Sequence, residues 1–235
     1  TAPHNDVWTV GTTYDNYNLA GMKLTALAYY QRYEALFGAT SSSSFQDPAI
    51  APIGTLYDQS RAFTDKYGTK IALTKDDFWD DRLKATVGFD TLFDNSKQDL
   101  WSTGRTYVPE INYTDLSPFL QLEYSPLESV KLSGGVRYEY ARLNIDSYQT
   151  TWANDRVSVE GGTPTFDQTL YNAGIVWTPL EPISLFASYS EGFTVPDVGR
   201  VLRGIDTPGV RLDEYSGLKP IVTKNSEAGF RIQQA

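Results

Sequence analysis

Residues 119–140 read FLQLEYSPLESVKLSGGVRYEY, two runs of alternating apolar and polar residues joined by SPLES at 125–129. In the second run, Leu132 and Val136 fall on one face of an extended chain and Arg137 falls on the other. Alternation with a period of two is typical of β-strands that have one apolar face. The stretch therefore predicts two long neighbouring strands joined by a tight turn.

The same alternation recurs along most of the chain. It is found in MKLTALAYY (22–30), YGTKIAL (67–73), LKATVGFDTLF (83–93), YNAGIVW (171–177) and ISLFASYSEGF (183–193). We predict an all-β fold, an antiparallel up-and-down meander of about nine long strands. These are expected near 6–14, 21–36, 63–74, 82–95, 112–125, 128–147, 165–178, 181–194 and 221–233. No helix is predicted, and EALFGA (34–39) is assigned to the end of the second strand.

The connections alternate in length. Short ones are DNYNLA (15–20), TKDDFWDD (74–81), SPLES (125–129) and TPLEP (178–182), and long ones span roughly 38–62, 95–112, 148–164 and 194–219. Every second connection of a meander lies at the same end, so tight turns gather at one end and long loops at the other. That layout is typical of outer-membrane β-barrels, whereas soluble sandwiches have mixed loop lengths at both ends.

Aromatic side chains fit the same interpretation. The chain has 16 Tyr, 11 Phe and 5 Trp, and barrels carry aromatic girdles where strands leave the bilayer. We expect Phe78 and Trp79 at the membrane interface. The girdles themselves are predicted to contain Tyr29, Tyr30, Tyr124, Tyr138, Tyr140, Trp177 and Tyr189.

Composition excludes several functions. The formal net charge is −9, which argues against nucleic-acid binding, where basic residues supply the affinity. There is no cysteine, so disulfides, thiolate metal sites and cysteine nucleophiles are excluded. The longest mostly apolar run, residues 24–30, is far shorter than the about 20 residues of a membrane-spanning helix.

No catalytic motif is recognisable. His4 is the single histidine and lies at the N-terminus, a poor position for a Ser-His-Asp triad or a zinc site. The acidic turn at 76–81 offers oxygen ligands for Ca²⁺ but lacks the spacing of an EF-hand, and a solvated turn is the preferred interpretation. We predict a protein that is not an enzyme and that has no cofactor and no metal site.

The long loops hold the best candidates for ligand recognition, because aromatic and Arg side chains are common anchors and Arg binds carboxylates through paired hydrogen bonds. The candidates are Trp101, Arg105, Tyr107, Trp152, Arg156, Arg200, Arg203, Arg211 and Tyr215.

Two phrases resemble TonB-dependent outer-membrane receptors of the ferric-siderophore type. SLFASYSEGFTVPDVGRVLRG (184–204) has the Tyr-Ser-Glu-Gly-Phe strand end, followed by Pro196 and a long loop. KNSEAGFR (224–231) is similar to the family's strand opening, with Glu227, Gly229 and Arg231 at alternate positions. Ser226 stands where the family usually has an aromatic residue.

The resemblance implies that the sheet is part of a 22-stranded transmembrane β-barrel with a plugged lumen. Residues 1–235 are then expected to be a partial barrel domain, with the plug domain and the terminal strands absent. The intact parent would take up ferric siderophores or similar iron chelates across the outer membrane of a Gram-negative bacterium. Its extracellular loops would bind the chelate, and the absent plug would contact TonB.

The resemblance also has consequences for the chain by itself. It is not expected to transport. Its expected partners are an iron chelate, outer-membrane lipid and the TonB system, and it would self-associate through two open sheet edges. The sequence leaves three alternatives: a soluble all-β carbohydrate-binding or adhesin-like module, an outer-membrane barrel enzyme, and a plain porin.

Overall fold

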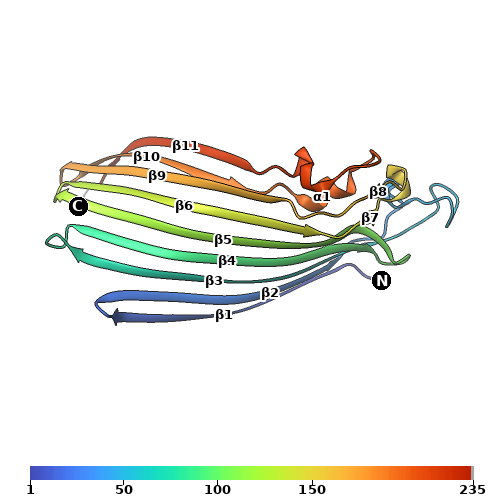
Figure 1. Ribbon diagram of the computed structural model, residues 1–235, viewed down its shortest axis with the longest axis horizontal. Helices are drawn as coiled ribbons and strands as arrows, with labels where there is room; N and C mark the ends of the chain where they lie inside the picture. Colours follow the sequence, from blue (N-terminus) through green and yellow to red (C-terminus); the bar gives the residue numbers. More distant parts are fainter. Residues whose placement is uncertain (234–235) are drawn as a thin grey trace.

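Nine long strands form one antiparallel sheet in the computed structural model, which describes residues 1–233. They follow one another in chain order across the sheet, so the predicted all-β meander is confirmed (Figure 1). The strands are β1 (His4–Leu19), β2 (Met22–Leu36), β3 (Ser60–Phe78), β4 (Leu83–Leu100), β5 (Arg105–Leu127), β6 (Val130–Ile145), β9 (Thr165–Leu180), β10 (Ile183–Thr194) and β11 (Ile221–Ile232). A two-stranded ribbon, β7 (Tyr148–Gln149) with β8 (Ser158–Val159), lies in the connection between β6 and β9.

The two ends of the sheet differ as the connection lengths predict. One end, here called the turn end, holds the short connections 20–21, 79–82, 128–129 and 181–182. The opposite end, here called the loop end, holds the segments 37–59, 146–164 and 195–220 (Figure 1).

One predicted loop is wrong. Residues 95–112 are mostly strand, because β4 continues to Leu100 and β5 starts at Arg105. The side chain of Asn95 donates hydrogen bonds to Glu110 and Asn112, each at 2.7 Å, across this extension. One face is polar here and the other mixes the polar Ser96 and Gln98 with the apolar Val108 and Ile111, so the regular alternation is lost although the backbone pairing continues.

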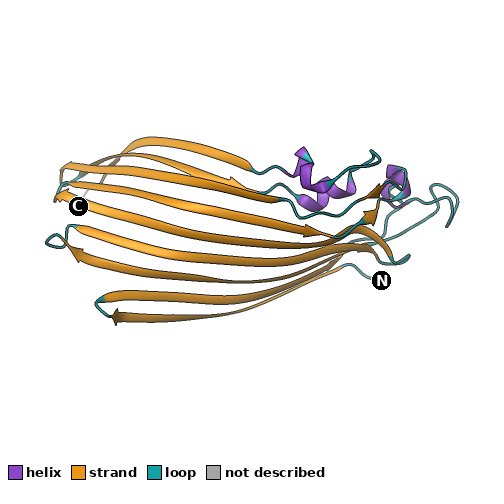
Figure 2. Ribbon diagram, in the orientation of Figure 1, coloured by secondary structure: helices purple, strands orange, loops and turns teal. Residues whose placement is uncertain are grey.

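The prediction of no helix is also wrong, but only at the loop end (Figure 2). The helices are α1 (Val198–Arg203) and the 3₁₀ turns η1 (Ser43–Phe45), η2 (Trp152–Asn154), η3 (Leu212–Glu214) and η4 (Ser216–Leu218). Asp197 caps α1 by accepting a hydrogen bond from the backbone N of Arg200 at 2.9 Å. Among the helices of residues 1–233, none is long and apolar enough to cross a membrane.

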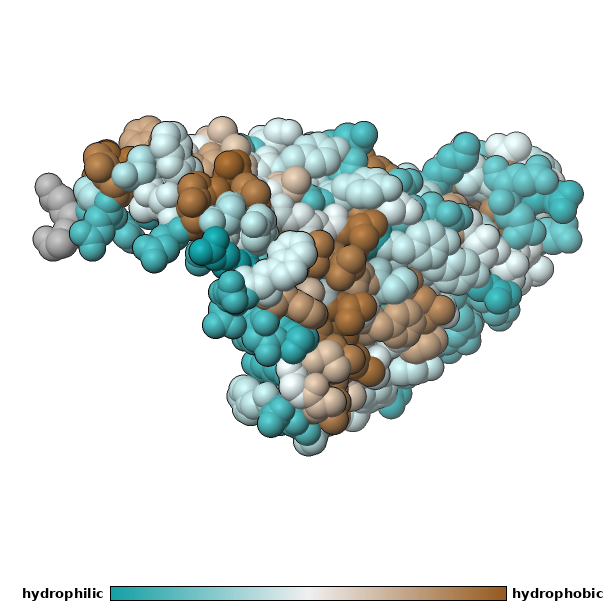
Figure 3. All heavy atoms as spheres, turned by 60° about the vertical axis from the view of Figure 1, so that its left-hand side comes forward, coloured by the Kyte–Doolittle hydropathy of each residue, from teal (hydrophilic) through white to brown (hydrophobic). Residues whose placement is uncertain are grey.

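The register places apolar side chains on one face, here called the outer face. One row across it is Leu24, Leu73, Val87, Leu120, Val136 and Tyr171. Many apolar side chains of this face are exposed, for example Val87 at 54% and Trp177 at 47%. Figure 3 shows apolar residues, in brown, gathered on the surface of the molecule. A contiguous exposed apolar surface of this extent needs an apolar surrounding.

The opposite face, here called the inner face, is polar. Lys70, Asp90 and Ser117 share one row on it. Arg137 forms ion pairs with Asp90 at 2.8 Å and with Glu139, and the Ser117 hydroxyl donates a hydrogen bond to Glu139. An apolar outer face and a polar inner face are the arrangement of a membrane barrel wall.

Aromatic rings from neighbouring strands lie over glycines on the inner face. The ring of Phe119 lies over Gly88, where an added Cβ would come within 2.4 Å of the ring. Tyr29 lies over Gly68 in the same way, so its predicted place in an outer girdle is wrong. Only glycine leaves room for these rings against the sheet.

Two aromatic rows mark the outer face. Towards the loop end, Tyr67 stacks on Phe93 with ring centroids 5.0 Å apart. At the turn end, Trp79 contacts Tyr124 edge-on with ring centroids 6.2 Å apart. Leu83, the partner of Tyr124, lies ten residues before Phe93 (93 − 83). Ten residues span roughly 33 Å along a strand, which at a tilt of about 40° matches the roughly 25 Å apolar band of a barrel.

Candidate ligand-binding site

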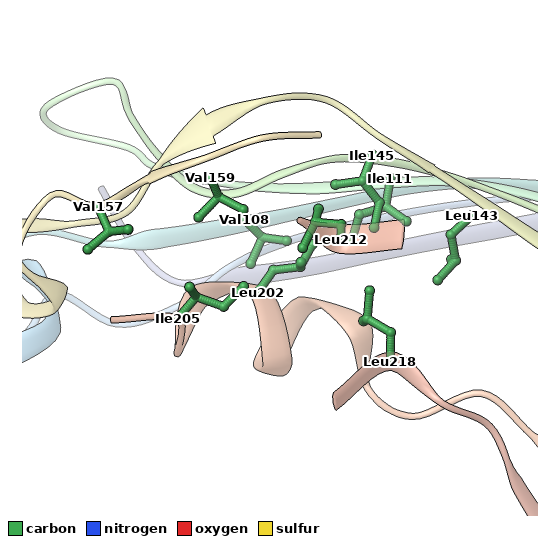
Figure 4. Close-up of a cluster of buried hydrophobic side chains, with 10 residues drawn as sticks. All are labelled: Val108, Ile111, Leu143, Ile145, Val157, Val159, Leu202, Ile205, Leu212 and Leu218. Atoms are coloured by element: carbon green, nitrogen blue, oxygen red, sulfur yellow. The ribbon is translucent and has the colours of Figure 1, made fainter. Parts of the chain in front are cut away.

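The loop end has a hydrophobic core of its own (Figure 4). The inner faces of β5 and β6 contribute Val108, Ile111, Leu143 and Ile145. The loops contribute Val157 and Val159 from 146–164 and Leu202, Ile205, Leu212 and Leu218 from 195–220. Leu202, Leu212 and Leu218 are fully buried, so both loops fold inwards onto the wall.

A pocket of about 420 Å³, here called the inner pocket, lies between this wall and residues 195–199. Its polar lining includes Thr64, Asp94, Ser96, Gln98 and Tyr113. One oxygen of Asp94 pairs with Lys66 at 3.1 Å. The other is buried and has no hydrogen-bond partner within residues 1–233.

Five predicted recognition residues lie on this inner side. The Arg203 guanidinium lies over the Tyr107 ring at 5.5 Å and donates to Gln98 of the inner pocket at 3.4 Å. Tyr215 packs against the hydrophobic core. Arg200 on α1 and Arg211 are exposed, and the backbone of Arg211 bridges to Glu160 of the segment 146–164.

Arg105 and Arg156 instead hold the segment 37–59 in place. Arg105 ion-pairs with Asp58 at 3.5 Å and Asp47 at 3.7 Å, and it donates to the carbonyl of Phe45 at 2.6 Å. Arg156 pairs with Asp47 as well. Sequence reasoning missed Asp47 and Asp58, because these partners are distant in sequence and no local spacing links them.

Burial and hydrogen bonding oppose each other at Asp58. Burial alone would raise the pKa of this carboxyl, but the Thr103 hydroxyl donates to it at 2.6 Å and the Ser102 and Gln59 backbone N–H groups donate at 2.8 Å. The balance lowers the pKa of Asp58, because all three bonds favour the ionised form. A buried, ionised Asp58 therefore anchors the turn that joins β4 to β5.

Trp101 and Trp152 complete the predicted set. The guanidinium of Arg61 lies over the Trp101 ring at 4.5 Å, and Trp101 is 44% exposed. Trp152 is 37% exposed and lines a second pocket of about 420 Å³ together with Arg105 and Arg156. None of the nine predicted residues lines the inner pocket itself, and Arg203 reaches it through its hydrogen bond to Gln98.

The geometry of the inner pocket offers groups for ligand recognition. Within residues 1–233, no cluster of three or more His, Asp or Glu side chains is placed to hold a metal ion. The inner pocket combines hydroxyls, an amide, two carboxylates and the ammonium of Lys97 with apolar walls, which suits the binding of a polar ligand.

An antiparallel wall with one apolar and one polar face, and with long loops at one end, is the arrangement of a membrane β-barrel. The family model described as "TonB dependent receptor-like, beta-barrel" matches residues 1–235. The chain belongs to this family, and the resemblance found in the sequence is confirmed.

Curated relatives are named as siderophore receptors. The ferric aerobactin receptor of Klebsiella pneumoniae is 29% identical over 181 residues, which cover 64% of this chain and 24% of the relative. The rhizobactin receptor of Rhizobium meliloti (strain 1021) is 23% identical, with 95% of this chain and 34% of the relative covered. The ferric aerobactin receptor of Escherichia coli is 26% identical, with 86% and 30% covered. The chain thus spans about a quarter to a third of the length of these relatives.

Solved structures share the fold. The copper transporter OprC aligns with a TM-score of 0.72 and 17% identity over 97% of this chain and 36% of its own. The ferric yersiniabactin uptake receptor FyuA from Yersinia pestis aligns with a TM-score of 0.64 and 15% identity over 99% of this chain and 34% of its own. The family match and the shared fold favour a membrane barrel over the soluble all-β module.

Proposed function

We propose that this chain is part of an outer-membrane receptor for the TonB-coupled uptake of ferric siderophores. The observation that carries the proposal is the position of the arginine-rich segment 195–220. Its hydrophobic core fixes it to the inner face, beside the inner pocket. Three relatives named as aerobactin or rhizobactin receptors supply the ligand class.

The nine predicted residues have two roles in this proposal. Tyr107, Arg200, Arg203, Arg211 and Tyr215 contact the iron chelate from the inner side. Arginines suit a carboxylate-bearing chelate, because their paired N–H groups match carboxylate geometry. Arg105 and Arg156 act indirectly by holding the loops, and the exposed rings of Trp101 and Trp152 are free for other contacts.

The location follows from the outer face. Its apolar band between two aromatic rows matches the thickness of a bilayer core. Such barrels have long extracellular loops and short periplasmic turns, so the loop end faces the cell exterior and the turn end faces the periplasm. Lipid covers the outer face. We propose that no bond is made or broken in the ligand and that transport requires the whole receptor, with its plug contacting TonB.

The test is iron uptake by source cells. Cells that lack the gene for the intact protein are expected to lose uptake of ⁵⁵Fe-labelled ferric aerobactin, and the wild-type gene restores it. A receptor with Arg200, Arg203 and Arg211 all changed to Ala is expected to bind the chelate at least tenfold more weakly, because several charge-assisted contacts are lost. Its matched control is Arg82→Ala at the turn end. Unchanged uptake in cells without the gene would refute aerobactin as the ligand.

A further inference from the structure

The second pocket, here called the outer pocket, lies on the outward side of the loop end. Ile111 of β5 pairs with Ile145 of β6, and both side chains are buried on the inner face. Strand side chains alternate between faces, so the neighbouring Glu110 and Asp146 point outwards. Both are exposed and line the outer pocket.

The outer pocket stands above the apolar band. Glu110 accepts a hydrogen bond from Asn95, and Asn95 is two residues beyond Phe93 of the aromatic row. In the proposed membrane position, this height along the wall is that of the outer-leaflet headgroups. A ligand here would therefore come from the membrane side and not from the lumen.

The charges of the outer pocket disfavour a phosphate. Its two arginines are already paired, Arg156 with Asp47 and Arg105 with Asp47 and Asp58. Two cations and two carboxylates cancel, which leaves the negative charges of Glu110 and Asp146. An anionic group would be repelled, whereas hydroxyl donors would bind these carboxylates well.

The remaining lining suits a sugar. Trp152 presents an aromatic surface that is 37% exposed. Hydroxyl-bearing Ser147 and Thr151 lie in the same pocket, with the amide of Gln149, whereas the hydroxyl of Thr150 is already hydrogen-bonded to Asn154 and Val157. An indole combines a flat apolar surface with polar neighbours, and hydroxyls and amides both donate and accept hydrogen bonds. A pocket of about 420 Å³ has room for a small oligosaccharide segment.

We propose that the outer pocket binds the neutral, hydroxyl-rich saccharide of an outer-leaflet glycolipid, with Trp152 against a sugar ring and Glu110 and Asp146 accepting from its hydroxyls. This site rests on the proposed membrane position and is separate from the chelate side of the wall. It ties the loop 146–164 to the surrounding membrane surface.

Two probes test the proposal on the intact receptor in detergent. They are lipopolysaccharide from the source strain and a neutral, lipid-free core oligosaccharide prepared from it without its anionic sugars, each titrated by microscale thermophoresis. Both are expected to bind, and each should compete with the other. Trp152→Ala is expected to weaken both by about tenfold, as for the loss of an aromatic contact, and Glu110→Gln by several-fold. Trp152→Phe should restore most of the affinity, which separates a lost contact from a misfolded loop.

The controls separate this site from the other interactions. Trp79→Ala removes an exposed indole at the turn end and should leave both affinities unchanged. Lipopolysaccharide binding that is insensitive to Trp152→Ala but abolished by inorganic phosphate would overturn the proposal in favour of phosphate recognition. Binding of maltotriose but not of the core oligosaccharide would contradict the proposal that the saccharide belongs to a glycolipid of the outer leaflet. Cells with the Glu110→Gln receptor should take up the ferric chelate as the wild type does. Chelate uptake and saccharide binding are therefore independent results, and a failure of the proposed transport function would be distinguishable from a failure of the saccharide site.

Discussion

The two ends of the sheet are built differently from the same strands. At the turn end, connections of two to four residues leave side chains open, and Trp79 is 73% and Leu180 61% exposed. At the loop end, Leu202 and Leu212 are fully buried in a core made by two loops and the wall. The turn end therefore relies on backbone pairing and its surroundings, whereas the loop end has the packing of a small globular unit.

The largest expected effect comes from opening the loop-end core. Leu202→Ala removes a fully buried side chain and should destabilise the segment 195–220 by about 2–5 kcal/mol. Amide hydrogen exchange of the receptor should become faster throughout that segment. The matched control is Leu180→Ala at the turn end, where little burial is lost. Equal exchange in the two variants would show that the loop end has no core of its own.

A second test concerns the wall that both ends share. Gly88→Ala places a Cβ within 2.4 Å of the Phe119 ring and 2.7 Å of a backbone oxygen, so we expect a loss of about 1–3 kcal/mol. In Gly134→Ala, by contrast, the new Cβ meets its nearest atom at 3.7 Å. Urea unfolding of both variants in detergent measures the difference. If Gly134→Ala cost as much as Gly88→Ala, the ring-over-glycine packing would not be the cause.

The ion pairs at the loop end are expected to matter less than its core. Arg105→Gln leaves the buried Asp58 with its three hydrogen bonds but without its cation, at a cost of about 1–3 kcal/mol. Hydrogen exchange should rise in residues 37–59 and remain unchanged at the turn end. Arg200→Gln changes an exposed arginine and serves as the control. Faster exchange at both ends would mean that the ion pairs stabilise the whole sheet.

The smallest effect is a pH dependence confined to the loop end. The folded pKa of Asp58 is lowered, so its stabilising contribution is fully present above its ordinary pKa of about 3.9. That contribution is lost as the pH falls through the lowered folded value. Exchange protection of residues 37–59 should be constant from pH 8 to 5 and should fall only in stronger acid. Asp58→Asn should flatten this acid response, and an unchanged response in that variant would assign it to another group.

Strand order was predictable because the bilayer imposes a strong pattern. Where one face meets lipid and the other meets a polar lumen, residues must alternate, as Leu120 to Tyr124 and Val130 to Val136 do. In the loop-end extension of β4 and β5 the outer face is polar, and the inner face mixes polar residues with the apolar Val108 and Ile111. For that reason the pairing of Asn95 with Asn112 and Glu110 carried no alternation, and the predicted loop 95–112 was wrong.

The loop end was less predictable for a different reason. Helix α1 has six residues, too few to give a periodic signal, and it forms because Leu202 is buried against Val108 and its neighbours. The recognition residues were chosen by type alone. Type does not distinguish Arg105, which is held by Asp47 and Asp58, from the exposed Arg200. Only the fold distinguishes residues such as Arg203, on the inner side, from residues such as Arg105, which hold the loops. The roles of all nine predicted residues in binding stay predictions.

Cysteine labelling in intact source cells tests the membrane position most directly. The chain has no cysteine, so single changes can be introduced into a receptor cleared of any other cysteine. Asp206→Cys at the loop end should react with a membrane-impermeant maleimide in intact cells, and Asp81→Cys at the turn end only after the outer membrane is permeabilised. Val87→Cys on the outer face should stay unreactive in both cases, because lipid covers it. Labelling of Asp81→Cys in intact cells, or of Val87→Cys as readily as Asp206→Cys, would contradict the account.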